Sequence, residues 1–153
     1  MAMTDDKQKA QILVAGCGKL GGDIATVLLG AGDVYGLRRN PDRVPQGVTG
    51  IGADLTRPES MAGKLPEHLD IVVYCLTPSS YDEEGYHQAY VTGLKNLLNF
   101  IGEQSLKRLI FISSTSSSYS HLSVSGLTPH RWKSRLISLN LRALSPRLRK
   151  RPQ

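Results

Sequence analysis

Three glycines near the start of the chain have a spacing that suits the binding of phosphate groups. Gly16, Gly18 and Gly21 stand at G-x-G-x-x-G spacing directly after the apolar run Ile12–Ala15. In such a loop the first glycine permits a tight turn, the second lets the backbone approach a pyrophosphate, and the third lets the next helix pack closely on the strand. The N–H groups and the positive dipole end of that helix then face the phosphates. The spacing therefore predicts a dinucleotide-binding loop. Its other members are Cys17, Lys19 and Leu20.

The pair Gly18-Lys19 also occurs in mononucleotide P-loops. A P-loop needs a further glycine five residues before Gly18, where this chain has Leu13. It also needs a Ser or Thr after the lysine to hold magnesium, and Leu20 stands there instead. We therefore expect a dinucleotide loop without a metal site.

Two arginines follow the second predicted strand, Val34–Leu37. In a dinucleotide-binding fold the end of this strand meets the adenine ribose, where an acid would bind the 2′-hydroxyl and repel a 2′-phosphate. Arg38 and Arg39 occupy this place, and guanidinium groups bind phosphate through forked, charge-assisted hydrogen bonds. We predict NADP as the cofactor in preference to NAD. The alternative is a pair of solvated loop arginines.

Asp54 and Leu55 follow a short, glycine-rich strand, Val48–Ala53. The carboxylate of Asp54 would accept a hydrogen bond from the adenine amino group of a bound cofactor. It would serve equally as a cap for the helix that Pro58 begins. The two roles are compatible, and the sequence leaves both open.

The clearest buried strand is Ile71–Leu76, a run rich in β-branched residues. Leu76 and Thr77 stand at its carboxyl end, followed by Pro78, which indicates a turn. Open α/β sheets bind ligands at the carboxyl ends of their strands. We therefore expect Leu76 and Thr77 to contact the cofactor.

Helices alternate with these strands. Tyr86–Ile101 has helical periodicity, and Leu109–Ile112 is a fifth buried strand that leads into Ser113–Ser116. Five strands that alternate with helices imply right-handed crossovers and a parallel sheet. We predict an α/β fold over residues 10–116, a Rossmann-type doubly wound sheet of order 3-2-1-4-5 with helices on both faces.

Four features together resemble the extended short-chain dehydrogenase/reductases, the NAD(P)-dependent epimerase/dehydratase group. They are the glycine loop, the pair Asp54-Leu55, the helix pattern Tyr90–Leu98 and the strand end Ile112–Ser116. The resemblance covers about residues 10–116. It implies hydride transfer between a nicotinamide and a carbon of a nucleotide sugar. Family chains are about twice as long, so we expect this one to end before the substrate domain.

The resemblance also implies a catalytic Ser or Thr after the fifth strand, and the matching position is Ser114, with Thr115 beside it. A strand-end cluster that only satisfies backbone groups is the alternative. The family's acid/base pair, Tyr-x-x-x-Lys, has no match, because none of the six tyrosines has a lysine four residues later. We expect cofactor binding with an incomplete catalytic set, which leaves a non-catalytic dinucleotide-binding or interaction module as the alternative function.

Charge divides the chain near residue 117. Residues 117–153 contain eight Lys and Arg and no acid, a charge of +8. Residues 1–116 contain 11 basic and 13 acidic residues, a charge of −2, so the whole positive excess of the chain, +6 in sum, lies in its last quarter. This tail fits a basic segment that binds an anionic surface, a disordered extension, or divergent sequence that replaced the family's continuation. We favour the third, because family-like residues stop near Ser116.

Residues 1–9 are polar and are expected to be a flexible terminus without a secretory signal. No apolar run approaches the roughly 20 residues that span a bilayer, so no membrane partner is expected. The chain has two cysteines, which fits reduced thiols in the cytoplasm. The expected partners are the dinucleotide and a nucleotide sugar. Nucleic acid is not favoured, because only the basic tail supports it.

Overall fold

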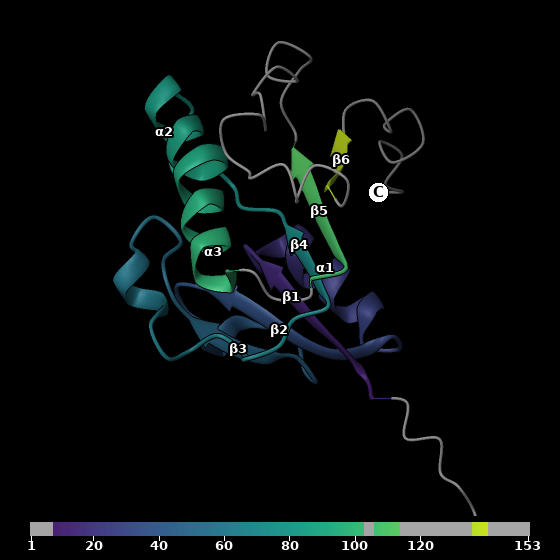
Figure 1. Cartoon of the computed structure of the whole chain (residues 1–153). Helices are drawn as coiled ribbons and strands as arrows, with labels where there is room; N and C mark the ends of the chain where they lie inside the picture. Colours follow the sequence, from purple (N-terminus) through teal and green to yellow (C-terminus); the bar gives the residue numbers. More distant parts are fainter. Residues whose placement is uncertain (1–7, 103–105, 114–135, 141–153) are drawn as a thin grey trace, which may run out of the picture.

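The computed structural model describes residues 8–102, 106–113 and 136–140 (Figure 1). Strands and helices alternate along the chain, with short 3₁₀ turns after the second and third strands. In order, the elements are β1 (Ala10–Ala15), α1 (Lys19–Leu28), β2 (Gly32–Arg38), η1 (Pro41–Arg43), β3 (Thr49–Gly52), η2 (Pro58–Met61), β4 (Ile71–Tyr74), α2 (Glu83–His87), η3 (Gln88–Thr92), α3 (Gly93–Ile101), β5 (Arg108–Ser113) and β6 (Leu136–Asn140).

The strands form one parallel sheet of order β3-β2-β1-β4-β5-β6. Strand β1 lies between β2 and β4, and Ile12 pairs with Val34 on one side and with Ile71 on the other. Strands β2 and β3 are therefore added on one side of β1, and the later strands are added on its other side. The predicted Rossmann-type order 3-2-1-4-5 is confirmed.

The sixth strand was not predicted. The composition of 117–153 indicates no further strand, yet β6 pairs in parallel with β5, with Leu109 opposite Leu136 and Ser113 opposite Asn140. Five residues among arginines and serines make a weak local signal, and the open edge of β5 supplies the hydrogen-bonding groups that such a strand needs. The rest of the predicted tail, 117–135 and 141–153, lies outside the described residues, as do residues 1–7.

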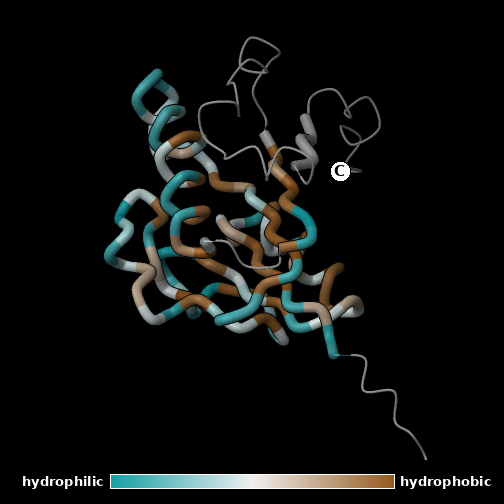
Figure 2. Tube along the Cα trace, viewed as in Figure 1, coloured by the Kyte–Doolittle hydropathy of each residue, from teal (hydrophilic) through white to brown (hydrophobic). Residues whose placement is uncertain are grey.

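The core has two layers, one on each face of the sheet. Because alternate side chains of a strand point to opposite faces, Leu13 and Ala15 pack with the leucines of α3, whereas Ile12 and Val14 pack with Ala25 of α1. Figure 1 shows α1 behind the sheet and α2 and α3 in front of it, and Figure 2 shows the hydrophobic strands between them. The helices thus cover both faces, as a buried parallel sheet requires.

The predicted helix Tyr86–Ile101 is found, but it starts three residues earlier and contains a π turn. The Asp82 carboxylate accepts the Gly85 N–H at 2.8 Å and caps the first turn, and α2 then continues through η3 into α3. Gly102, with φ of +63°, ends the helix. Among the described residues, no helix has the length and apolarity needed to cross a bilayer.

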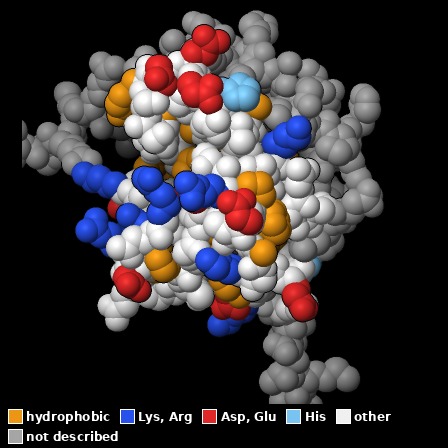
Figure 3. Space-filling view, turned by 90° about the vertical axis from the view of Figure 1, so that its left-hand side faces the viewer, with side chains coloured by type: hydrophobic (Ala, Val, Ile, Leu, Met, Phe, Trp, Pro, Cys, Tyr) orange, Lys and Arg blue, Asp and Glu red, His pale blue; other side chains and the backbone are white. Residues whose placement is uncertain are grey.

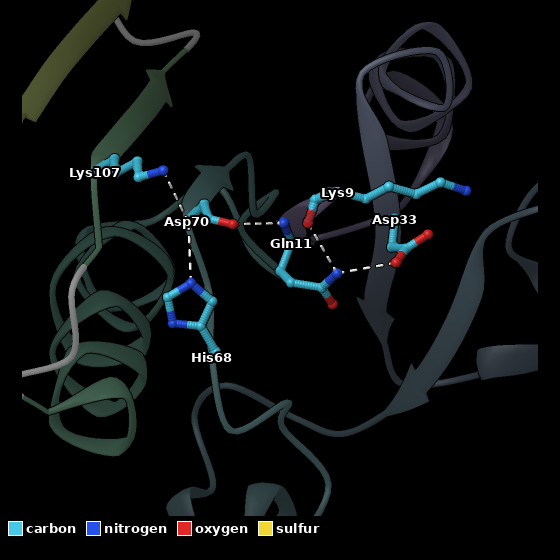
Figure 4. Close-up of polar contacts among 6 residues, drawn as sticks. All are labelled: Lys9, Gln11, Asp33, His68, Asp70 and Lys107. Atoms are coloured by element: carbon cyan, nitrogen blue, oxygen red, sulfur yellow. Dashed lines mark hydrogen bonds and ion pairs between the residues drawn. The ribbon is translucent and has the colours of Figure 1, made fainter. Parts of the chain in front are cut away.

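A buried carboxylate joins three strands at the end of the sheet opposite the glycine loop (Figure 4). Asp70 accepts the Gln11 N–H at 2.8 Å, and its other oxygen lies 3.0 Å from His68 Nε2 and 3.5 Å from Lys107 Nζ. Its backbone carbonyl accepts the Lys107 N–H at 2.7 Å. The hydrogen bond from Gln11 lowers the pKa of Asp70 despite its burial, with help from His68 and Lys107. The carboxylate therefore stays ionised and holds β1, β4 and β5 in register.

Candidate functional site

The glycine loop packs into the corner between β1, β2 and β4. Gly16 has φ of +89°, and a Cβ there would lie 2.7 Å from the backbone nitrogen of Leu76. A Cβ on Gly21 would collide with the carbonyl oxygen of Gly16. The N–H groups of Gly16 and Cys17 both donate to the Leu37 carbonyl at 3.0 Å. These contacts fix the loop, and only glycine fits at 16 and 21.

Gly18 faces open space. No atom lies within 4 Å of a Cβ built on it, in contrast to Gly16 and Gly21. It precedes Lys19, where α1 begins, and the first N–H groups of an α-helix have no partner within the helix. The loop therefore presents exposed backbone and a helix amino end, which is a cradle that suits a pyrophosphate.

A cleft of about 370 Å³ runs along the carboxyl ends of the strands beside this loop. Nine of the residues predicted to contact the cofactor line it. They are Gly16, Cys17, Gly18, Arg38, Arg39, Asp54, Leu55, Leu76 and Thr77. Of the other three, Gly21 is buried behind the loop, and Lys19 and Leu20 are exposed in the first turn of α1. The structure thus brings four separate strand ends together around one space.

The cleft has further walls that the sequence pattern does not single out. One side adds Leu37, Asn40, Arg43, Ala53 and Thr56, and the other adds Ser79, Gly85, Gln88 and Ala89. The place of Arg43 in the cleft could be predicted from the sequence, because Asn40-Pro41 indicates a turn that brings the next residues back toward the end of the strand. The place of the cleft residues Gly85, Gln88 and Ala89 could not be predicted in this way, because it depends on a π turn in their helix.

Three arginines lie at the end of β2, and they differ in their contacts. Arg38 Nη1 donates to the carbonyl oxygens of Cys17 at 3.1 Å and of Arg43 at 3.2 Å. Arg39 is exposed and makes no hydrogen bond or ion pair within the described part of the chain. The exposed Arg43 also lines the cleft. One arginine therefore holds the loop, while two present guanidinium groups to a ligand.

The Asp54 side chain forms its hydrogen bonds within the loop that follows β3. Its carboxylate accepts the Thr56 N–H at 2.9 Å and the Thr56 hydroxyl at 2.7 Å. It does not cap η2, whose N-cap residue is Arg57, so the capping role considered from the sequence is not found. Burial acts to raise the pKa of Asp54, but the bonds from Thr56 and the charges of Arg39 and Arg57 together lower it. Asp54 is an ionised acceptor on the wall of the cleft.

Asn96 explains part of the helix pattern that resembles the epimerase/dehydratase group. Its side-chain amide donates to the Leu55 carbonyl at 2.8 Å, a contact between α3 and the loop after β3. That loop supplies the cleft residues Asp54, Leu55 and Thr56. The asparagine therefore positions this wall of the cleft.

One of the two cysteines, Cys17, belongs to the glycine loop, and the other, Cys75, packs against it. Both are free and buried, and the Cys75 thiol donates to the Gly16 carbonyl at 3.3 Å. Burial raises the pKa of Cys75 to about 12 and also raises the pKa of Cys17, although Arg38 opposes the second shift. Both thiols are therefore protonated at neutral pH and act as packing groups.

The predicted catalytic residues cannot be placed in the cleft. Ser114 and Thr115 lie outside the described residues, which stop at Ser113 of β5 and resume at Leu136. None of the described tyrosines lines the cleft. Within the same described ranges, no three His, Cys, Asp or Glu side chains are grouped to hold a metal ion.

Charge is unevenly distributed on the face that Figure 3 shows. Basic side chains gather at its mid-height, below a group of acidic side chains at the top. Along the chain, the first turn of α2 contains Glu83 and Glu84, and the end of β2 with the turn after it contributes three arginines to the lining of the cleft. A ligand with its negative charge at the β2 end fits this distribution.

The family model for NAD(P)H-binding proteins matches residues 16–144 of this chain. That range contains the glycine loop, the carboxyl ends of β2, β3 and β4 around the cleft, and β6. No curated protein matches the chain.

Several solved structures have this fold. A protein from Methylobacillus flagellatus described as an NAD-dependent epimerase/dehydratase is 38% identical, with a TM-score of 0.55 over 70% of this chain and 38% of that one. UDP-galactose 4-epimerase is 19% identical, with a TM-score of 0.58 over 74% and 41% of the two chains. A short-chain dehydrogenase/reductase superfamily protein from Agrobacterium tumefaciens, solved with bound NAD, is 21% identical, with a TM-score of 0.55 over 68% and 32%. The chain thus spans 32–41% of the length of these proteins.

Proposed function

This chain belongs to the NAD(P)H-binding family, and on that premise we propose that it binds NADP in preference to NAD. Its resemblance to the epimerase/dehydratase group is confirmed by the 38% identity to the Methylobacillus protein. We further propose that it serves as the cofactor domain of an oxidoreductase that acts on nucleotide sugars in the cytoplasm. The sugar proposal draws on UDP-galactose 4-epimerase, which shares the fold.

The residues present fit a nicotinamide dinucleotide. The space at Gly18 and the amino end of α1 are free to take the pyrophosphate. The ionised Asp54 on the wall of the cleft would accept a hydrogen bond from the adenine amino group, and Leu76 and Thr77 would contact the cofactor farther along the cleft. When bound, the nicotinamide would give or take a hydride. This chain's own part is to hold and orient it.

The observation that carries the NADP preference is the pair of available arginines. Arg39 and Arg43 line the cleft at the end of β2, where an acid would repel a 2′-phosphate. The acid that follows in η1, Asp42, does not line the cleft. Arg38 is a positioning residue, because its Nη1 is engaged with two backbone carbonyls. A phosphate between Arg39 and Arg43 would receive charge-assisted hydrogen bonds from both.

The experiment is a titration of NADPH against the full chain and three single variants. Arg39→Ala and Arg43→Ala each raise the Kd for NADPH by about tenfold, the value expected for one lost hydrogen bond to a charged group. Arg108→Ala is the matched control, because Arg108 is an exposed arginine at the opposite end of the sheet. An unchanged Kd in both cleft variants, or an equal loss in the control, would refute the phosphate site.

A non-catalytic dinucleotide-binding module is the second candidate. The observation in its favour is that no tyrosine of the 153-residue sequence has a lysine four residues later. The positioned proton donor of the family is thus missing. The two candidates share the cofactor and differ in whether the chain turns over a substrate.

A further inference from the structure

The helix that forms one wall of the cleft contains a π turn at the point where it meets the cleft. In η3 the Gly93 N–H donates to the Gln88 carbonyl, five residues back, whereas an α-helix would direct it to Ala89. Gly85, Gln88 and Ala89, on the amino side of this turn, line the cleft. The leucines of α3, on its carboxyl side, pack into the core.

The π turn allows one continuous helix to line the cleft with its amino-terminal part and to pack into the core with its carboxyl-terminal part. At about 100° per residue, Gly85 and Leu97 would lie about 120° apart around an uninterrupted α-helix. One inserted residue removes about 100° of this difference, so that the two face nearly the same way. Gly85 and Ala89 are accordingly buried beside the cleft, and Leu97 is buried in the core. Without the inserted residue, Gly85 and Ala89 would rotate away.

A tyrosine on the sheet contacts the π turn directly. Tyr74, the last residue of β4, is fully buried, and its hydroxyl donates to the Ala89 carbonyl at 2.5 Å. Its ring stacks on Phe111 of β5 with centroids 5.7 Å apart. A Cβ on Gly93 would collide with the Tyr74 hydroxyl, so the glycine makes room for this contact. Burial also raises the pKa of Tyr74, so the hydroxyl remains a donor.

Tyr74 itself does not line the cleft. We infer that Tyr74 is a positioning residue for the nicotinamide half of the cofactor: its hydroxyl holds the Ala89 carbonyl and thereby the π turn that keeps Gly85 and Ala89 against the cleft. The assignment of halves follows from the site, because the arginines at the β2 end define the adenosine half and Gly85 and Ala89 lie beyond Thr77. The inference rests on the proposed dinucleotide function.

The test compares a whole cofactor with a fragment. Full-length chain with Tyr74→Phe keeps the stacked ring and loses only the hydroxyl. We expect its Kd for NADPH to rise about three- to tenfold, the effect of one net hydrogen bond. Its Kd for adenosine 2′,5′-bisphosphate, which has no nicotinamide, stays within about twofold. Tyr35→Phe is the control, because that hydroxyl bonds Gln11 at 2.9 Å away from the cleft.

A second variant protects the test against a folding effect. As a single variant, Gly93→Ala places a methyl group against the Tyr74 hydroxyl and weakens NADPH binding. In the double variant with Tyr74→Phe it causes no further loss of NADPH affinity, because the hydroxyl that the methyl group would meet is absent. The inference is overturned if Tyr74→Phe leaves the NADPH Kd unchanged, or if it weakens the fragment as much as the whole cofactor. A wild-type chain that binds neither compound refutes the proposed function, and the inference with it.

Discussion

The guanidinium of Arg38 lies 3.1 Å from the carbonyl oxygen of Cys17, so that a side chain from the end of β2 is hydrogen-bonded to the glycine loop after β1. The same nitrogen donates to the Arg43 carbonyl at 3.2 Å and so also holds the loop that follows β2. Arg38, which lines the cleft beside Arg39, therefore also positions the two loops around the predicted cofactor site.

Arg38 and Arg39 are adjacent, and their substitution should have different effects. Arg38→Ala releases the glycine loop, and we expect it to raise the Kd values for NADP and NAD alike, by about tenfold. Arg39→Ala removes a guanidinium that only a 2′-phosphate would meet and weakens NADP alone. Fluorescence titration of both reduced cofactors measures this. A selective loss of NADP binding in Arg38→Ala would contradict the positioning role.

Substitutions at two glycines of the loop should distinguish an effect on stability from an effect on cofactor binding. Gly16→Ala combines a positive φ with a collision against the Leu76 backbone, and it should lower the free energy of unfolding by about 1–3 kcal/mol or more. Gly18→Ala meets no neighbour, so its cost in stability should be smaller and limited to the weaker N-cap that alanine gives α1. Its methyl group keeps a pyrophosphate from the backbone and raises the Kd for NADP about tenfold. Denaturant unfolding and cofactor titration of both variants provide the comparison. Equal effects on stability would show that the loop is described wrongly.

Asp70 should make stability depend on pH. Its pKa is lowered in the folded chain, so its contribution is fully present above the unfolded value of about 3.9 and is lost as the pH falls through the lower folded value. We expect Asp70→Asn to lower the free energy of unfolding at pH 7 by about 1–3 kcal/mol, and the difference from wild type to shrink below about pH 4. Asp33→Asn is the control, because Asp33 accepts one exposed hydrogen bond from Gln11. A difference that persists unchanged at pH 3 would argue against the ionised carboxylate.

Catalysis on nucleotide sugars should be weak even where the cofactor binds. Losing a positioned acid or base typically costs about 10²–10⁴ in rate, and the sequence has no Tyr-x-x-x-Lys pair. The check is to incubate the chain with NADP(H) and a panel of nucleotide sugars and to follow absorbance and product. Turnover at an ordinary enzymatic rate that is lost in Ser114→Ala would show that another residue replaces the tyrosine.

Much of the fold was predictable because the signals are local. The apolar run Ile12–Ala15 with its glycine loop, and the β-branched run that contains Ile71–Tyr74, each specify a strand within a few residues. Once five strands alternate with helices, right-handed crossovers leave few sheet orders. The cleft follows, because parallel strands bring their carboxyl ends to one edge.

The rest depends on contacts between distant residues. The π turn exists where Tyr74 meets Ala89, 15 residues away, and no periodicity in the helix alone indicates which residues will turn toward the cleft. The role of Arg38 depends in the same way on the Cys17 carbonyl, 21 residues away. Strand β6 is determined by the open edge of β5 more than by its own five residues.

The most direct test of the central claim is a calorimetric titration of the full chain with NADP and with NAD at the same pH and salt concentration. With Arg39 and Arg43 open to the cleft and no acid among the cleft residues at the end of β2, NADP should bind at least about tenfold more tightly than NAD. Equal affinities, tighter binding of NAD, or no heat of binding for either dinucleotide would contradict the account.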